Sequence, residues 1–156
     1  MNLILKATSQ ADLVTLFAYQ THKTSILMAA FTAENPNDKE AYMDKWSKII
    51  TNPQINMQSI YVDDQLVGSI LCFDMMDETN VSYWLGHKYW NKGIASKSLK
   101  RFLQKTKKRL LIGRTAFDNY GSQKVLTKCG FTFMRKETDF ANARGKKIEE
   151  YIYILK

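Results

Sequence analysis

The segment Val81-Ser-Tyr-Trp-Leu-Gly-His-Lys-Tyr-Trp-Asn-Lys-Gly-Ile-Ala-Ser96 is the most informative part of this chain, because its pattern changes from strand to helix. Its first residues, up to Leu85, combine β-branched and aromatic side chains, which is typical of a strand. From Gly93 to Thr106, apolar side chains recur at helical spacing, with lysine and arginine on the other side. The segment therefore predicts a strand, a short loop and a helix.

The junction between this loop and the helix is suited to an anion. Backbone N–H groups at the start of a helix have no partner within the helix, and the helix dipole favours negative charge there. Gly93 and Ala95 are small enough for a phosphate to approach the backbone, and Lys92 adds a cation beside them. A glycine in this place also fits an ordinary turn, so the pattern alone leaves both interpretations open.

A second segment, Thr115-Ala-Phe-Asp-Asn-Tyr-Gly-Ser-Gln-Lys-Val-Leu-Thr-Lys-Cys-Gly-Phe131, has a similar arrangement. It follows a predicted strand, Leu110–Thr115, and opens a short predicted helix, Asn119–Cys129. Asp118 or Asn119 is suited to cap that helix, and Ser122 lies one turn after Asn119 on the same side. The pattern fits a functional helix start and equally a plain capped helix whose apolar side chains face the core.

The remaining segments complete a mixed pattern of strands and helices. The capping box Ser9-Gln-Ala-Asp12 predicts one helix start, and Asn37-Asp-Lys-Glu40 predicts another. The apolar stretch Ile26–Phe31 fits neither pattern, and Thr138–Lys147 is polar enough to be a loop. No repeat or linker divides the chain, so residues 1–156 are expected to form a single α/β (α+β) domain. Further strands are predicted at Leu3–Ala7, Ser59–Val62, Leu66–Phe73, Phe131–Arg135 and Ile148–Leu155.

The charge of the chain is uneven. Its 156 residues carry a formal net charge of +8, but residues 1–85 hold five basic and ten acidic side chains, and residues 86–156 hold the other eighteen basic and five acidic ones. A basic half favours an anionic partner. Lys105–Arg109 and Arg144–Lys147 are the best support for nucleic-acid binding. Short basic runs usually belong to a solvated face, and no nucleic-acid-binding signature is present, so that partner is not expected.

Several classes of protein do not fit the composition. Only three consecutive apolar residues, Leu3–Leu5, precede Lys6, too few for a signal peptide, and no apolar run approaches the roughly 20 residues of a membrane span. Two cysteines, Cys72 and Cys129, and two histidines are too few and too scattered for a metal site. We therefore expect a cytoplasmic domain without metal, whose cysteines are small core residues.

The two segments together resemble the GNAT superfamily of acetyl-CoA-dependent N-acetyltransferases, and most closely the branch of the ribosomal-protein N-terminal alanine acetyltransferases. Trp90-Asn-Lys-Gly-Ile-Ala95 is similar to the family's pyrophosphate loop, and Tyr83-Trp-Leu-Gly86 to its fourth strand. Asn119-x-x-Ser122, followed by Val-Leu-x-Lys-x-Gly-Phe131, is similar to the helix after its fifth strand. The resemblance implies a twisted, mostly antiparallel mixed sheet of six to seven strands, with about four helices and a splay between strands 4 and 5.

The resemblance also implies a mechanism, in which an acetyl group passes from acetyl-CoA to a primary amine by direct attack in a ternary complex. A backbone donor near Trp84 or Leu85 would stabilise the oxyanion. Asn119 would contact the cofactor arm, and Ser122 would protonate the departing thiolate. Lys124 would bind a cofactor phosphate or simply be a solvated helix residue. The pyrophosphate would lie on the backbone of Asn91, Lys92, Gly93, Ile94, Ala95 and Ser96.

The chain departs from the family pattern at two catalytic positions. The usual glutamate of the fourth strand is Asn80 here, and Glu78 lies just upstream, where it would accept a proton directly or through water, or be only a polar loop residue. The usual tyrosine acid is replaced by Leu126, which leaves the role to Ser122. These departures keep open a domain that binds coenzyme A without catalysis.

The acceptor is not specified by any motif. A protein or peptide N-terminus and a small-molecule amine both fit, and the acidic excess of residues 1–85 predicts a groove that tolerates a cation. Residues 26–37 and 138–147 are expected to shape the acceptor pocket. The final strands are also expected to be exposed, which makes a homodimer plausible.

Overall fold

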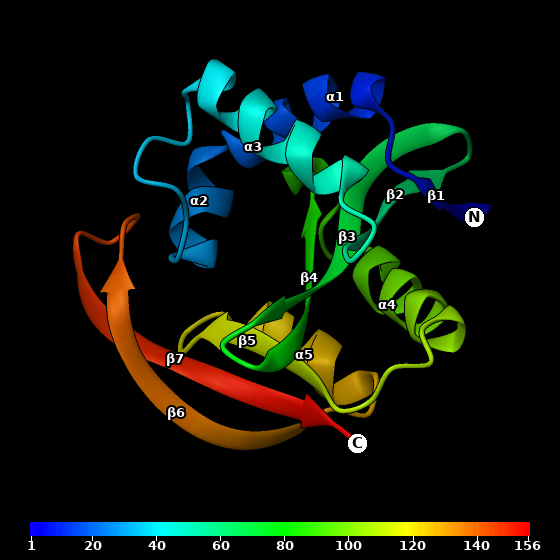
Figure 1. Ribbon diagram of the computed structural model, residues 1–156. Coiled ribbons are helices and arrows are strands. Elements are labelled where there is room, and N and C mark those ends of the chain that lie inside the picture. The colour runs from blue at the N-terminus through cyan, green and yellow to red at the C-terminus, as the bar shows by residue number, and fades with distance from the viewer.

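The computed structural model describes all 156 residues and contains seven strands and five α-helices (Figure 1). The strands are β1 (Leu3–Ala7), β2 (Asn56–Val62), β3 (Gln65–Met75), β4 (Glu78–Leu85), β5 (Leu111–Ala116), β6 (Thr132–Ala141) and β7 (Lys146–Leu155). The helices are α1 (Gln10–Gln20), α2 (Lys23–Ala29), α3 (Lys39–Thr51), α4 (Ile94–Lys105) and α5 (Tyr120–Lys128), with a 3₁₀ turn at His87–Tyr89.

All seven strands form one sheet in the order β1-β2-β3-β4-β5-β7-β6. Every neighbouring pair is antiparallel except β4 and β5, which are parallel. β4 pairs with β3 along its whole length but with β5 only at Asn80 and Val81. Beyond Val81 the two strands diverge, and the backbone of β4 that faces β5 has no strand partner. This confirms the predicted mixed sheet and its splay.

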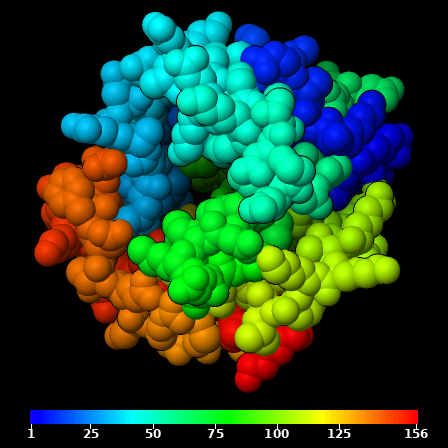
Figure 2. Space-filling view, in the orientation of Figure 1, coloured from blue at the N-terminus to red at the C-terminus, as the bar shows by residue number.

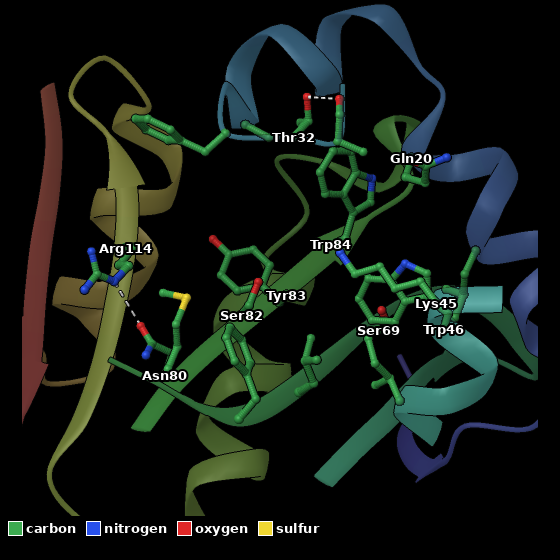
Figure 3. Close-up of a pocket in the computed structure, with 18 of the residues that line it drawn as sticks. Gln20, Thr32, Lys45, Trp46, Ser69, Asn80, Ser82, Tyr83, Trp84 and Arg114 are labelled. Carbon is green, nitrogen blue, oxygen red and sulfur yellow. Dashed lines mark hydrogen bonds between the residues drawn. The ribbon is translucent and has the colours of Figure 1, made fainter. Parts of the chain in front are cut away.

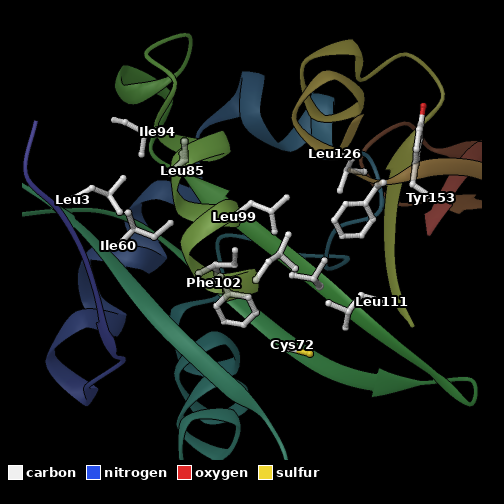
Figure 4. Packing of buried hydrophobic residues seen from close by; sticks show 14 of the residues in the cluster. Leu3, Ile60, Cys72, Leu85, Ile94, Leu99, Phe102, Leu111, Leu126 and Tyr153 are labelled. Atoms are coloured by element: carbon white, nitrogen blue, oxygen red, sulfur yellow. The ribbon is translucent and has the colours of Figure 1, made fainter. Parts of the chain in front are cut away.

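Successive side chains of β4 point to opposite faces of the sheet. Val81, Tyr83 and Leu85 belong to the largest apolar cluster, which α4 and α5 cover with side chains such as Leu99, Phe102 and Leu126 (Figure 4). On the opposite face α1, α2 and α3 lie together (Figure 1). There Leu13 and Leu16 of α1 pack on Met57 and Leu71 of the sheet, and Tyr42 and Trp46 of α3 lie against this second cluster.

The predicted helix starts are confirmed, because their capping groups are in place. The side chain of Ser9 accepts a hydrogen bond from the backbone of Asp12, and the carboxylate of Asp12 accepts one from the backbone of Ser9 at 3.0 Å. Asp38 caps α3 by accepting from the backbone N–H of Ala41 at 3.0 Å. Each cap satisfies a backbone donor that the helix itself leaves unpaired.

Two predicted segments differ in the structure. The unassigned stretch Ile26–Phe31 lies largely in α2, which His22 caps through its ring nitrogen. The predicted loop over 138–147 is wrong, because β6 continues to Ala141 and β7 begins at Lys146. Polar side chains are tolerated there because β6 is an edge strand with much of its surface exposed. Ala141 and Ile148 are nevertheless buried beside Ala30 and Ala116, which fixes the register of this extension.

Candidate functional site

A cavity of about 790 Å³ lies on the α1–α3 side of the sheet, where β4 and β5 diverge. Figure 2 shows it as a hollow between the α2–α3 region (cyan) and β3–β4 (green). β4 contributes residues from Asn80 to Trp84 to its wall, and β5 contributes Arg114 to Ala116 (Figure 3). Its aromatic walls are Phe31, Tyr42, Trp46, Phe73, Tyr83 and Trp84, and its charged side chains are Asp38, Lys45, Asp74, Arg114 and Glu150.

The start of α4 is the place where the sequence predicts an anion site. Gly93, the residue before the helix, has φ +79°, and no side chain caps the helix. A Cβ built on Gly93 would meet no atom within 4 Å, so this backbone is open. Asn91 also has positive φ, at 61°. The structure thus brings residues 91–96 into one turn whose N–H groups are free for a phosphate, while Lys92 lies exposed beside them.

At the start of α5, Asn119 and Ser122 lie together as predicted. Asn119 Oδ1 accepts a hydrogen bond from the Ser122 backbone N–H at 3.2 Å, and its Nδ2 donates to the carbonyl of Met28 at 3.4 Å. This second bond links α5 to α2 across the cavity. Both side chains line the cavity, so the cap of α5 is also part of the candidate site.

Tyr83 of β4 contacts Ser122. Its hydroxyl donates a hydrogen bond to Ser122 Oγ at 3.1 Å. Burial raises the pKa of Tyr83 to about 12, so the hydroxyl remains a proton donor at neutral pH. With one lone pair of Ser122 Oγ engaged by Tyr83, the Ser122 hydroxyl hydrogen is left to point elsewhere.

Trp84 and Leu85 lie on the part of β4 that has diverged from β5. Trp84 Nε1 donates to the carbonyl of Tyr19 at 3.2 Å, and the carbonyl of Leu85 accepts from Trp90 Nε1 at 3.3 Å. These bonds fix the end of β4 to α1 and to the loop before α4. Lys124 is exposed on α5 and forms no ion pair, which suits a phosphate contact and a solvated side chain equally.

Five charged side chains on the same face of the sheet form what we call the Arg114 cluster. Arg114 Nη1 lies 3.0 Å from Glu137 and 3.1 Å from Glu150, and its Nη2 lies 3.0 Å from Glu78. Arg135 bridges Glu78 at 3.0 Å and Glu137 at 2.7 Å. The cluster thus holds three carboxylates against two guanidinium groups.

The two residues nominated near the start of β4 both contact Arg114. Asn80 is buried, and its Oδ1 accepts from Arg114 Nε at 3.1 Å (Figure 3). Glu78 is held by Arg135 and Arg114, and hydrogen bonds from Arg135 are the main reason that its pKa lies below the usual value. The role of Glu78 in accepting a proton remains a prediction, and Asn80, which stands where the family has its glutamate, has a neutral amide in place of a base.

Glu150 differs from the other carboxylates of the cluster. Burial is the main reason that its pKa lies above the usual value, although its contact with Arg114 opposes the shift. Its side chain is only 13% exposed, compared with 24% for Glu78 and 37% for Glu137. Glu150 lines the cavity, and Glu78 and Glu137 do not.

Tyr83, Arg114 and Glu150 were not predicted from the sequence as functional side chains. One signal was available for Arg114, a lone charge within the apolar strand that begins at Leu111. Tyr83 and Glu150 follow strand alternation, but only the register of β4, β5 and β7 reveals which face each occupies.

The two segments expected to shape an acceptor pocket have different positions. Ala29 and several residues up to Pro36 line the cavity. The turn after β6 supports this segment from behind: Asn142 Nδ2 donates to the carbonyl of Thr32 at 2.8 Å, and Arg144 Nε donates to that of Leu27 at 2.8 Å. The turn therefore positions the cavity wall without lining the cavity.

No group of three or more histidine, cysteine, aspartate or glutamate side chains is placed to bind a metal ion. None of the helices has the length and apolar character needed to cross a membrane.

Comparison with known protein families identifies a family that matches most of this chain. The family described as "Acetyltransferase (GNAT) domain" matches residues 2–132. Among curated proteins, no sequence is significantly similar to this chain. Solved structures share the fold at low sequence identity. The ribosomal L7/L12 α-N-protein acetyltransferase RimL, in complex with coenzyme A, has a TM-score of 0.84 and 17% identity, covering 99% of this chain and 94% of its own.

Two further structures are similar over the whole chain. The ribosomal-protein-S5-alanine acetyltransferase from Vibrio fischeri has a TM-score of 0.80 and 15% identity, covering 99% of this chain and 93% of its own. The putative acetyltransferase yncA from Salmonella typhimurium, with its cofactor acetyl-CoA, has a TM-score of 0.82 and 14% identity, covering 100% and 94%.

Proposed function

Because this chain belongs to the GNAT acetyltransferase domain family, we propose that it transfers the acetyl group of acetyl-CoA to a primary amine. The observation that carries the proposal is the cavity at the divergence of β4 and β5, which has Ser122 on its wall. The uncapped start of α4, which follows β4 in the chain, is a separate feature that supports it. The similar folds of RimL and yncA, which bind coenzyme A and acetyl-CoA, support the choice of co-substrate.

The pyrophosphate of acetyl-CoA binds the start of α4. The free N–H groups of residues 91–96 donate to its oxygens, and the helix dipole stabilises the negative charge. Gly93 permits a phosphate to approach the backbone because glycine has no Cβ and adopts the left-handed conformation without strain. Lys92 and Lys124 supply mobile cations for the phosphates, since neither is paired with a carboxylate.

The pantetheine arm lies between the diverging strands. Backbone groups of β4 beyond Val81 lack a partner on β5, so they are free to bond the arm and the thioester. A backbone N–H near Trp84 or Leu85 faces the carbonyl oxygen and stabilises the oxyanion, an effect of roughly 3–4 kcal/mol per donor. Asn119 contacts the arm from the cap of α5.

The chemical step is direct attack in a ternary complex. The neutral amine nitrogen attacks the thioester carbonyl carbon, and the C–S bond breaks as the tetrahedral intermediate collapses. The Ser122 hydroxyl donates its proton to the departing sulfur, so that the thiolate leaves as a thiol, and it regains a proton from the nitrogen as the amide forms. Tyr83 positions Ser122 by donating to its oxygen. Glu78 is the carboxylate near the start of β4 that the sequence nominates to take a proton from the amine, and Asn80 occupies the place of the family's usual glutamate.

The acceptor enters on the α1–α3 side, where the cavity has aromatic walls and the side chains of Asp38 and Asp74. These features favour an ammonium group attached to an apolar neighbour. An N-terminal residue of a protein and a small amine both meet this description, and the names of RimL and the S5 acetyltransferase support the first.

Thiol release from acetyl-CoA, measured over a panel of N-terminal peptides and small amines, tests the proposal. We expect release with at least one amine, together with a product heavier by one acetyl group. Ser122→Ala should lower kcat by about 100-fold while acetyl-CoA still binds. Binding of acetyl-CoA without release on any amine would support a non-catalytic domain instead.

A further inference from the structure

We infer that Glu150 is the catalytic base, the group that takes the proton from the acceptor ammonium before the nitrogen attacks. This inference rests on the proposed acetyl transfer and deepens it, because that reaction needs a neutral amine. Glu150 lies on β7, far in sequence from the fourth-strand residues Glu78 and Asn80.

The first argument is the geometry of its carboxylate. Glu150 Oε1 accepts a hydrogen bond from Arg114 Nη1 at 3.1 Å, while Oε2 accepts none from the protein. Glu78 and Glu137 differ, since both oxygens of each are bonded to a guanidinium group. Glu150 is therefore the carboxylate of the Arg114 cluster that keeps an oxygen free.

The second argument is its position. Glu150 lines the same cavity as Ser122 and Asn119. Its strand partner on β5 is Ala116, so Glu150 lies next to the strand that diverges from β4. Its side chain is on the face of the sheet that carries Arg114. An ammonium group bound in the cavity is thus able to reach Glu150 from the side opposite α4 and α5.

The third argument is charge. The groups that face Glu150 are Arg114 on β5, and Glu137 and Asp139 on β6, while Glu78 and Arg135 complete the cluster. The cluster carries one more negative than positive charge, which attracts a cation. Most donors of Arg114 are already bonded to Asn80, Glu78, Glu137 and Glu150, so the guanidinium is not available to an anionic acceptor.

The protonation equilibrium supports the same role. Burial first, and then the nearby Glu137 and Asp139, raise the pKa of Glu150, against the effect of Arg114. A raised pKa makes a carboxylate a better proton acceptor at neutral pH. The ionic contacts of Glu78 lower its pKa and make Glu78 a weaker proton acceptor.

The proton balance of the step is simple. Glu150 takes one proton from R–NH₃⁺ and becomes a carboxylic acid, and the freed electron pair of nitrogen attacks the thioester carbon. The C–S bond breaks, and sulfur leaves as the thiol with the second proton that the nitrogen loses, which Ser122 relays. Glu150 then releases its proton to water, so that each turnover yields one amide, one thiol and one proton.

The test compares Glu150→Gln with Glu137→Gln as the matched control. Glu137 is the strand partner of Glu150 and contacts the same Nη1 of Arg114, but it lies outside the cavity. The measurements are acetyl-CoA binding by calorimetry, the melting temperature, and kcat/KM for one accepted amine from pH 6 to 9.

We expect Glu150→Gln to lower kcat/KM by about 100-fold at pH 7, and the loss to shrink at higher pH. Without a base, only the free amine reacts, and its fraction rises about tenfold per pH unit up to the amine pKa. Glu137→Gln should keep most of the activity and a pH profile of the natural shape, displaced to lower pH because a negative charge that raises the pKa of Glu150 is removed. Both variants should bind acetyl-CoA normally.

An equal loss of kcat/KM in the two variants, or a loss of kcat/KM in Glu150→Gln that does not change with pH, would overturn the inference. Either result would leave the proposed acetyl transfer intact. No turnover by the natural protein on any amine would instead overturn the proposed function and the inference with it. If Glu150→Gln does not fold, Glu150→Asp gives the same decision: a reduced rate with the natural pH profile supports a carboxylate base, and an unchanged rate contradicts it.

Discussion

Tyr83 and Ser122 come from different elements, β4 and α5, and meet through a single hydrogen bond of 3.1 Å. Replacing Tyr83 with Phe removes that donor and leaves the ring in place. We expect a decrease in kcat of about fivefold with little change in the KM for acetyl-CoA, because a lost hydrogen bond of about 1 kcal/mol misdirects the Ser122 hydroxyl. Steady-state kinetics measures both constants.

Tyr151→Phe is the control for this substitution, because Tyr151 belongs to the same side of the core but forms no side-chain hydrogen bond to Ser122. Its kcat should match that of the natural protein. If Tyr83→Phe also keeps full kcat, Tyr83 does not position Ser122.

Asp12 is a buried carboxylate that supports the fold. It accepts hydrogen bonds from Ser59 Oγ at 2.9 Å and from the hydroxyl of Tyr61. Burial opposes its ionisation, but the bonds from Tyr61, Ser9 and Ser59 outweigh burial and hold the pKa of Asp12 below its usual value. Asp12→Asn should therefore lower the free energy of unfolding at pH 7 by about 1–3 kcal/mol.

The pH dependence of this effect follows from the lowered pKa. The stabilisation is complete above the unfolded pKa of about 3.9 and is lost as the pH falls through the folded value. Urea unfolding measures the free energy of unfolding at pH 7 and at pH 3. The difference in this free energy between Asp12→Asn and the natural protein should be smaller at pH 3. Asp44→Asn, at an exposed position of α3, is the control and should leave the free energy of unfolding unchanged at both pH values. A difference between Asp12→Asn and the natural protein that is the same at pH 7 and pH 3 would contradict this role of Asp12.

Site residues within motifs were predictable from sequence, and isolated ones were not. Asn119, Ser122 and Gly93 stand in local patterns with a direct physical meaning, a helix cap or a helix start. Glu150 gave no such signal, because its neighbour Glu149 is chemically identical. Only the pairing of β7 with β5 and β6 shows that Glu150 faces the cavity.

At the scale of elements, the start of α4 gives the clearest prediction. Gly93 and Gly145 both have positive φ, at 79° and 64°, and neither has an atom within 4 Å of a built Cβ. Alanine at either position costs about 1–2 kcal/mol for the left-handed conformation. Both variants should therefore melt at similarly lowered temperatures.

Only Gly93→Ala should weaken acetyl-CoA binding, by about tenfold, because relief of the strain turns the N–H groups of residues 91–96 away from the phosphates. Calorimetric titration of both variants measures the two affinities. Equal affinities would mean that this helix start does not hold the pyrophosphate.

Most elements were predictable because their boundaries carry capping or turn residues. Asp63 and Asp64, for example, adopt the positive φ of a tight hairpin between β2 and β3. The ends of β6 and β7 were not predictable, since the polar residues from Thr138 onward resemble a loop. Their strand structure depends on pairing with each other and on the buried Ala141 and Ile148.

Over the whole molecule, the uneven charge matches the two sides of the sheet. The acidic first half supplies α1, α2 and α3, which cover the cavity, and the basic second half supplies α4 and α5. This separation places cations near the proposed phosphate site, and Asp38 and Asp74 of the acidic half near the proposed ammonium site, while Glu150 comes from the basic half. β6 leaves one edge of the sheet unpaired, and a homodimer through that edge stays a prediction.

A crystal structure of the protein with bound acetyl-CoA is the most direct test. We expect the pyrophosphate on the backbone N–H groups of residues 91–96, the pantetheine between β4 and β5, and the thioester sulfur within hydrogen-bond distance of Ser122 Oγ. Acetyl-CoA bound elsewhere, for example on the basic run Lys105–Arg109, or a sulfur far from Ser122, would contradict the proposed site and its chemistry.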